Sequence, residues 1–165
     1  MERRLRRIAT GWLGANSPIV PKREPLIRII PDVISGFISV TLGSVLGVLS
    51  RYFVSGFVAR RVGETFPYGT LLINVSGALV IGVLGGLAPE KNSLFADPDA
   101  WLFAVTGFLG AYTTVSSFSL QTLSLARDGE GRRAMVYVVL SVALSLAAAA
   151  LGFVLVDALK LKRTR

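Results

Sequence analysis

Two sets of polar side chains repeat at helical spacing inside apolar segments of the chain. Thr70 and Asn74 are four residues apart, and Tyr137, Ser141 and Ser145 continue a second stripe at the same interval. Residues at this spacing share one face of a helix. A hydroxyl can bond back to its own helix, but the Asn74 amide cannot satisfy itself in lipid. The two sets therefore predict a hydrogen-bonding track, neither acidic nor basic, through an apolar protein.

A third polar stretch, "TGFLGAYTTVSSFS", lies at the centre of another apolar segment. Gly110 is flexible, and Thr113, Thr114 and Val115 form a β-branched run with low helix propensity, so a helix can break here. Non-helical backbone at membrane depth is tolerated only when it is buried in protein or lines a cavity. A break would free carbonyl oxygens for a hard cation such as sodium, and it would leave the positive end of a half-helix for an anion.

Two further side chains bear on the binding of an anion. Phe118 follows the expected break, and a phenyl ring presents its positive edge to an anion, although a single Phe in a membrane helix is usually packing. Arg51 is the one charge inside an expected span, and such a charge is a functional hypothesis by default. Its alternative role is to snorkel to the interface. As a functional group it would attract an anion to a pore mouth.

The composition places these residues in a membrane. Hydrophobic residues make up 52% of the 165 residues, and the mean hydropathy is +0.61. Several segments reach the roughly 20 apolar residues that cross about 30 Å of hydrocarbon. The chain has no cysteine and no histidine, which excludes disulfides, thiol or imidazole catalysis and the common zinc sites. We expect an all-α, multi-pass protein of the cell membrane that is not an enzyme.

Four spans are expected between two basic ends of the chain. They are predicted at about 32–58, 69–88, 101–126 and 134–159, within a membrane domain that covers 32–159. Asp99 is a plausible N-cap for the third span. Residues 1–31 are expected to be a basic extension, disordered or folded as a short interfacial helix, and residues 160–165 a basic tail. Glycine and other small residues are dense in the spans, which indicates close helix packing.

The charged residues narrow the functional classes. All ten acidic residues lie in tails, in loops or at span ends, so no carboxylate is expected at mid-membrane. Proton-coupled transporters usually carry such a group, and this disfavours a small four-helix multidrug-type transporter. It also disfavours a cation pore built on a carboxylate ring. The net charge of +8 comes from basic residues near span ends, where membrane topology uses them, so we expect no nucleic-acid partner.

Three motifs taken together resemble the Fluc/CrcB fluoride channels across about residues 36–155. "GSVLGVLSRYF" resembles the first-helix glycine pattern that ends in Arg-Tyr, and "GTLLINVSGALVIG" resembles GTL-x-VN-x-x-G. "TGFLGAYTTVSSFS" resembles GF-x-GG-x-TTFS-x-F. Any one of these would be a weak signal, but their joint occurrence, in order and at the right separations, is specific.

The resemblance implies a four-helix subunit, with its third helix broken near mid-membrane, in an antiparallel, dual-topology dimer. Such a dimer passes fluoride passively and lowers its concentration in the cytoplasm. The implied partners are fluoride, membrane lipid and a second subunit of the same or a homologous chain. A structural sodium ion at the dimer centre would be held by the carbonyls of Gly110 and Thr113. The implied pore residues are Asn74, Phe118, Thr70, Ser141, Ser145, Tyr137 and Thr114, with Arg51 at the pore mouth.

The chain departs from the family pattern at two positions. The family usually has two phenylalanines in the third-helix motif; Phe118 matches the second, and Val115 stands at the first. Ala111 replaces the second glycine of the GG pair. A valine has no ring edge to offer an anion. Either one wall of each pore is altered, or a partner subunit supplies the missing ring.

The basic residues are unevenly divided between the two sides of the membrane. With four spans, the side that holds both termini carries 12 Lys and Arg residues, against 5 on the other side. This excess favours both termini in the cytoplasm. If the six basic residues most remote from the first span are left out, the balance becomes 6 against 5. A dual-topology homodimer therefore stays open beside a heterodimer of fixed orientation, in which this chain alone could be non-conducting.

Overall fold

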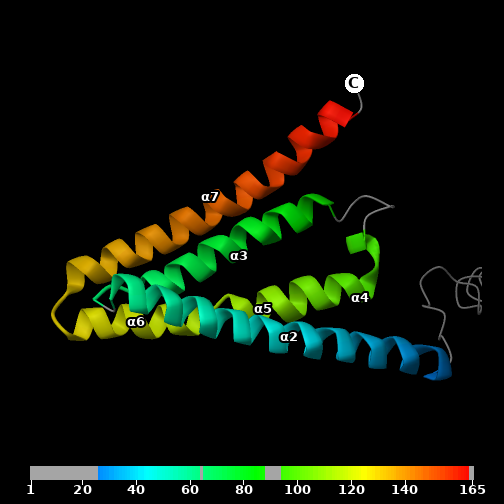
Figure 1. The fold of residues 1–165 in the computed structure, drawn as a ribbon, viewed down its shortest axis with the longest axis horizontal. Coiled ribbons are helices and arrows are strands. Elements are labelled where there is room, and N and C mark those ends of the chain that lie inside the picture. Colours follow the sequence, from blue (N-terminus) through cyan, green and yellow to red (C-terminus); the bar gives the residue numbers. More distant parts are fainter. Residues whose placement is uncertain (1–25, 64, 88–93, 164–165) are drawn as a thin grey trace, which may run out of the picture. The chain divides into compact units, whose positions relative to one another are not determined.

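The computed structural model describes residues 26–63, 65–87 and 94–163 (Figure 1). The chain divides into two compact units, residues 1–34 and 35–165. Of the first unit, only the start of helix α2 is described. Residues 1–25 of the predicted extension therefore lie outside the described residues. The last two residues of the predicted C-terminal tail, 164 and 165, lie outside them as well.

Every regular element of the described ranges is helical, which confirms the all-α fold class. In chain order the elements are α2 (Leu26–Val62), α3 (Tyr68–Leu87), η1 (Leu94–Ala96), α4 (Pro98–Trp101), η2 (Leu102–Leu109), α5 (Gly110–Tyr112), α6 (Val115–Arg127) and α7 (Gly131–Arg163).

Three of these helices are long and apolar enough to cross a membrane. They include Ile30–Val62 of α2, the whole of α3 and Gly131–Lys162 of α7. Their positions overlap the first, second and fourth predicted spans. Helix α2 begins at Leu26 and continues through Pro31, earlier than the predicted start at residue 32. Pro31 is the sixth residue of α2, so it lacks the N–H that would bond to the Ile27 carbonyl, and the helix continues with that one hydrogen bond missing.

The third predicted span is a succession of short helical pieces rather than one helix. α4, the π-helical η2 and α5 follow one another, and then the backbone becomes extended at Thr113 (φ −80°, ψ 159°) and Thr114 (φ −154°, ψ 121°). Helix α6 begins at Val115. The predicted break is therefore confirmed, at the run of three β-branched residues, whose helix propensity is low.

The start of the third span corrects one prediction. Asp97, not Asp99, is the N-cap of α4, because its Oδ1 accepts a hydrogen bond from the Ala100 N–H at 2.9 Å. Pro98 occupies the first helical position, where its fixed φ and missing N–H are tolerated. Asp99 lies in the first turn of α4, where its negative charge interacts favourably with the helix dipole.

Helices α3 and α7 lie side by side and approach closely through glycines (Figure 1). A Cβ on Gly82 would overlap the Ala149 carbonyl, and a Cβ on Gly152 would overlap the Leu79 carbonyl. Each helix thus contributes a glycine that lies directly against the main chain of the other. Lys160 of α7 also donates to the Gly86 carbonyl at 2.5 Å, where a cation stabilises the negative end of α3.

Helix α2 packs on the π-helical stretch in the same way. A Cβ on Gly107 would lie 2.7 Å from the Val40 carbonyl oxygen, and one on Gly43 would overlap the Phe103 carbonyl. A Cβ on Gly47 would overlap the Phe108 carbonyl. Small residues let helices approach in lipid, where association depends on van der Waals packing. Glycine packing therefore fixes the broken segment against α2.

We predict that Gly82→Ala destabilises the protein by about 1–3 kcal/mol, because the added methyl group meets main chain that cannot rotate away. Thermal unfolding in detergent measures the effect. Gly85→Ala is the matched control on the same helix, since its Cβ would meet the Phe153 ring at an ordinary 3.7 Å. A melting temperature that falls equally for both variants would contradict this account of the α3–α7 contact.

Candidate functional site

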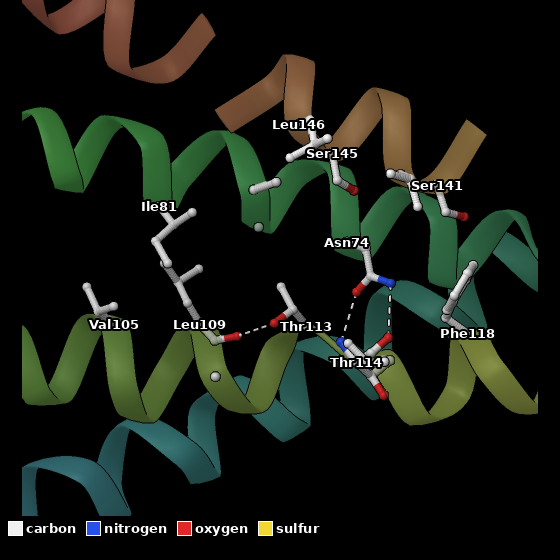
Figure 2. A pocket seen from close by; sticks show the side chains of 15 residues that line it. Asn74, Ile81, Val105, Leu109, Thr113, Thr114, Phe118, Ser141, Ser145 and Leu146 are labelled. Carbon is white, nitrogen blue, oxygen red and sulfur yellow. Dashed lines mark hydrogen bonds between the residues drawn. The ribbon is translucent and has the colours of Figure 1, made fainter. Parts of the chain in front are cut away.

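A groove of about 600 Å³ lies beside the break in the third segment (Figure 2). Residues of α3, α7 and the segment from η2 to α6 line it, and most of the lining is apolar. Eight of the residues predicted for the site line this groove: Asn74, Gly110, Thr113, Thr114, Val115, Phe118, Ser141 and Ser145. The structure thus brings together residues from three separate predicted spans.

Three predicted residues lie elsewhere. Arg51 and Thr70 line a second, smaller pocket of about 320 Å³, together with Gln121. Thr114 lines this pocket as well as the groove. Tyr137 is fully buried and is absent from the lining of both. The predicted track is therefore divided between a groove and a polar pocket that share one threonine.

The Asn74 side chain holds the backbone at the break. Its Nδ2 donates to the Thr114 carbonyl at 3.0 Å, and its Oδ1 accepts from the Thr114 N–H at 2.8 Å (Figure 2). A backbone N–H only donates and a carbonyl only accepts, so this pair fixes the orientation of the amide. Asn74 was predicted as a pore residue, and this structural role was not predicted. One hydrogen of Nδ2 remains outside the pair, so Asn74 keeps a donor for a ligand.

The same region releases two carbonyl groups from their helical pairing. In a continuous helix, the Gly110 carbonyl would accept from the Thr114 N–H, and the Thr113 carbonyl from the Ser117 N–H. Here the Thr114 N–H bonds to Asn74, and the Ser117 N–H bonds to Thr114 Oγ1 at 3.2 Å. Gly110 and Thr113 therefore lose their usual donors. They are the two residues whose carbonyls were expected to hold a cation.

Thr114 organises the start of α6. Its hydroxyl is 3.0 Å from Ser116 Oγ and donates to Ser117 Oγ at 3.2 Å, and the residue is buried. As the N-cap, it satisfies one of the N–H groups that a helix leaves unpaired at its start. The positive end of α6 thus lies at the break, where it favours negative charge.

An aromatic cluster positions Phe118 in the groove wall. The centre of the Phe118 ring is 5.3 Å from that of Tyr137, and the Phe66 ring meets Tyr137 edge-on at 5.5 Å. The Tyr137 hydroxyl donates to Gln121 Oε1 at 3.0 Å. Gln121 was not among the residues predicted for the site. Its place three residues after Phe118, on the same helical face, was the available signal.

Ser141 carries an unsatisfied polar group. The residue is only 6% exposed and lines the groove, and its hydroxyl has no hydrogen-bond partner among the described residues. A buried hydroxyl without a partner costs roughly 1–3 kcal/mol. Its oxygen is almost inaccessible and lies near the Tyr137 hydroxyl, so it would donate to a ligand in the groove only after the side chain turns. Ser145 lines the groove one turn further along α7.

Val115 occupies the position where the family pattern has a phenylalanine. It lines the groove and is 77% exposed, whereas Phe118 on the next turn is half-buried against Tyr137. The exposure of Val115 follows from its place at the first residue of α6, directly after the extended backbone. Among the described residues, one aromatic ring, that of Phe118, therefore lines the groove beside the break.

We predict that Asn74→Asp loosens the break, because a carboxylate accepts from the Thr114 N–H but cannot donate to its carbonyl. The loss should lower stability by about 2 kcal/mol and speed amide hydrogen exchange in the peptide that covers residues 113–118. Ser145→Ala is the control, since it changes a groove side chain without touching the pair. Unchanged exchange in the Asp variant would contradict the holding role of Asn74.

Comparison with known proteins places the chain in a family. It matches the family described as CrcB-like protein, Camphor Resistance (CrcB), over residues 38–153. It is 62% identical over 127 residues to the fluoride-specific ion channel FluC 2 of Bradyrhizobium diazoefficiens, an alignment that covers 77% of this chain and 93% of that protein.

Two further relatives carry the same description. The chain is 58% identical over 122 residues to the fluoride-specific ion channel FluC 2 of Rhodopseudomonas palustris, covering 74% of this chain and 93% of that protein. It is 45% identical over 118 residues to the fluoride-specific ion channel FluC of Rhodospirillum rubrum, and the alignment covers 72% of this chain and 92% of that protein. With its long apolar helices, the chain is a multi-pass membrane protein that belongs to the CrcB family.

Proposed function

We propose that this chain is a subunit of a fluoride channel, which lets fluoride cross the cell membrane passively and so lowers its concentration in the cytoplasm. Membership of the CrcB family and relatives described as fluoride-specific ion channels support the proposal. The observation that carries it is the groove, where the unpaired hydroxyl of Ser141, the Asn74 amide and the Phe118 ring converge from three helices.

The chemistry of the groove suits a small, strongly hydrated anion. Ser141 and the free Nδ2–H of Asn74 supply hydrogen-bond donors, and Phe118 can supply a ring edge that carries positive partial charge. None of the described residues that line the groove is charged. Donors without a full positive charge replace part of the hydration shell and still let the ion leave, which conduction requires.

Arg51 would concentrate the anion before it reaches the groove. It lines the polar pocket with Thr70 and Gln121, and Thr114 is common to this pocket and the groove. A positive charge in a confined polar pocket raises the local concentration of anions. In this proposal Thr114 is the point where the ion passes from pocket to groove, and the positive end of α6 helps to stabilise it there.

The donor set at the break fits a sodium ion. The carbonyls of Gly110 and Thr113 have lost their usual helical donors, and neutral carbonyl oxygens are typical ligands of hard cations. Two such carbonyls from each of two subunits would surround one ion. When bound, sodium would balance the partial negative charges of these carbonyls and fix the broken segments in place.

A second subunit would complete the pore. The groove is open, and Val115 at its edge is 77% exposed. In an antiparallel dimer of the same or a homologous chain, the partner would close the groove from the open side, and lipid would cover the remaining apolar faces. We favour a dual-topology homodimer. A small multidrug-type transporter is not supported, since the relatives are described as ion channels.

We predict that the purified chain, reconstituted in liposomes, releases trapped fluoride as measured with a fluoride electrode. Ser141→Ala should slow the release at least about tenfold, because a donor to the ion is lost. It should leave thermal stability unchanged or slightly higher, because the variant removes a buried hydroxyl that has no partner.

Two outcomes of this assay separate the alternatives. Release that appears only after a homologous partner is added would show an obligate heterodimer. No release under either condition would defeat the channel proposal. Ser119→Ala is the control for loss of a hydroxyl, since its Oγ donates to the Val115 carbonyl within its own helix and is exposed.

We also predict that a reporter fused to the C-terminus gives signal from both sides of the membrane, as a dual-topology homodimer requires. Val115→Phe should then raise the fluoride flux, because each pore gains a second ring edge. Reporter signal from the cytoplasmic side alone would instead show a fixed orientation. That result would favour a heterodimer whose partner supplies the missing ring.

A further inference from the structure

A second side-chain contact holds the broken segment to α3, close to the Asn74 pair. The hydroxyls of Ser76 and Tyr112 are 3.0 Å apart, and both residues are half-buried. Ser76 lies two residues after Asn74, and Tyr112 lies two residues before Thr114. Both occupy x positions, where the motifs GTL-x-VN-x-x-G and GF-x-GG-x-TTFS-x-F specify no residue type. The contact is therefore a property of this chain rather than of the motifs.

The direction of this hydrogen bond follows from the neighbouring contacts. Ser76 Oγ donates its single proton to the Ile73 carbonyl at 3.2 Å. The Tyr112 hydroxyl must therefore be the donor to Ser76 Oγ. The result is a directed chain, in which Tyr112 donates to Ser76 and Ser76 donates to the main chain of α3. Each bond in such a chain polarises the next.

The Tyr112 ring is held on two further sides. It stacks on the Phe108 ring one turn earlier, with centres 5.8 Å apart and planes only 8° from parallel. It also lies over Gly77, where an added Cβ would be 3.4 Å from Tyr112 Cδ1 and would overlap the Thr113 methyl group. The ring, and with it the end of α5, is thus fixed against one turn of α3.

We propose that Tyr112 and Ser76 are positioning residues for the sodium ion, and that their hydrogen bond sets how tightly this chain binds it. The inference rests on the sodium site of the proposed function. Tyr112 lies between Gly110 and Thr113, whose carbonyls are the proposed ligands. Asn74 fixes the backbone after these carbonyls, and the Tyr112–Ser76 bond fixes it before Thr113.

Two attachments to α3 hold the proposed sodium ligands more firmly than the Asn74 pair alone. With the Asn74 pair alone, α3 is bonded only to Thr114, and the extended backbone of Thr113 and Thr114 can still shift the Thr113 carbonyl relative to that of Gly110. With the second attachment, the short helix α5 cannot turn relative to α3. Carbonyls that already converge bind a cation more tightly, because less ordering remains to be done on binding.

The experiment is a sodium titration of the full-length reconstituted chain, read as the thermal unfolding temperature, with N-methylglucamine replacing sodium at constant ionic strength. Tyr112→Phe and Ser76→Ala should each raise the half-saturating sodium concentration by about fivefold. The double variant should be no weaker than the worse single variant, because both remove the same bond. Ser76→Thr keeps the hydroxyl and should restore the parent value.

Matched controls remove the same groups outside this contact. Tyr68→Phe loses a hydroxyl from a ring on α3 that packs at a tilt against Phe66, and Thr41→Ala loses a hydroxyl that donates to the Phe37 carbonyl of its own helix. Neither should change the sodium dependence. Fluoride release at saturating sodium should stay close to the parent rate in the Tyr112 and Ser76 variants, since neither residue lines the groove.

The outcomes distinguish this inference from the proposed function. An unchanged half-saturating concentration in both single variants, or an equal change in the controls, would overturn the positioning role. A parent chain that sodium does not stabilise would overturn the sodium site and this inference together. A parent chain that sodium stabilises but that releases no fluoride would overturn the channel proposal alone, and the titration would still test the Tyr112–Ser76 contact.

Discussion

The pairing of the Asn74 amide with the main chain of Thr114 is the interaction on which the site depends. A backbone that leaves helical geometry inside a membrane exposes N–H and carbonyl groups that lipid cannot satisfy. Asn74 satisfies one of each, at 2.8 and 3.0 Å, and so lets the third segment stay broken. The break frees the carbonyls of Gly110 and Thr113 and starts α6 at Val115, so that Phe118 reaches the groove.

Glycine packing supplies the rigidity that this pairing needs. α3 carries Asn74, and it lies against α7 with direct contact between the two backbones at Gly82 and Gly152. On the other side of the break, η2 is fixed against α2 at Gly107, Gly43 and Gly47. The polar atoms of the site therefore come from segments that cannot slide past one another without breaking main-chain contact. In lipid, where burial of apolar surface gives no driving force, close packing of this kind holds helices together.

Some polar residues of the site hold its structure and others could bind a ligand, and the residue types alone do not show which is which. Asn74, Thr114 and Tyr137 were all expected among the residues of one pore. In the folded chain, Thr114 caps α6, and Tyr137 is buried, where it supports Phe118 and bonds to Gln121. Ser141 differs from them, since its buried hydroxyl has no partner among the described residues. Polar side chains that have hydrogen-bond partners build the groove, whereas Ser141, whose hydroxyl has none, has a donor that a ligand could use.

The sequence by itself determined the fold class, the family and the place of the break. Apolar length, the absence of mid-membrane acids and the β-branched run at Thr113–Val115 are local properties, which a pattern in one segment is enough to express. Only the tertiary structure decided that Asn74 bonds to Thr114, that Ser76 meets Tyr112 and that Arg51 lines a separate pocket. These contacts join residues far apart in the chain, and their partners are set by how closely glycines let the helices approach.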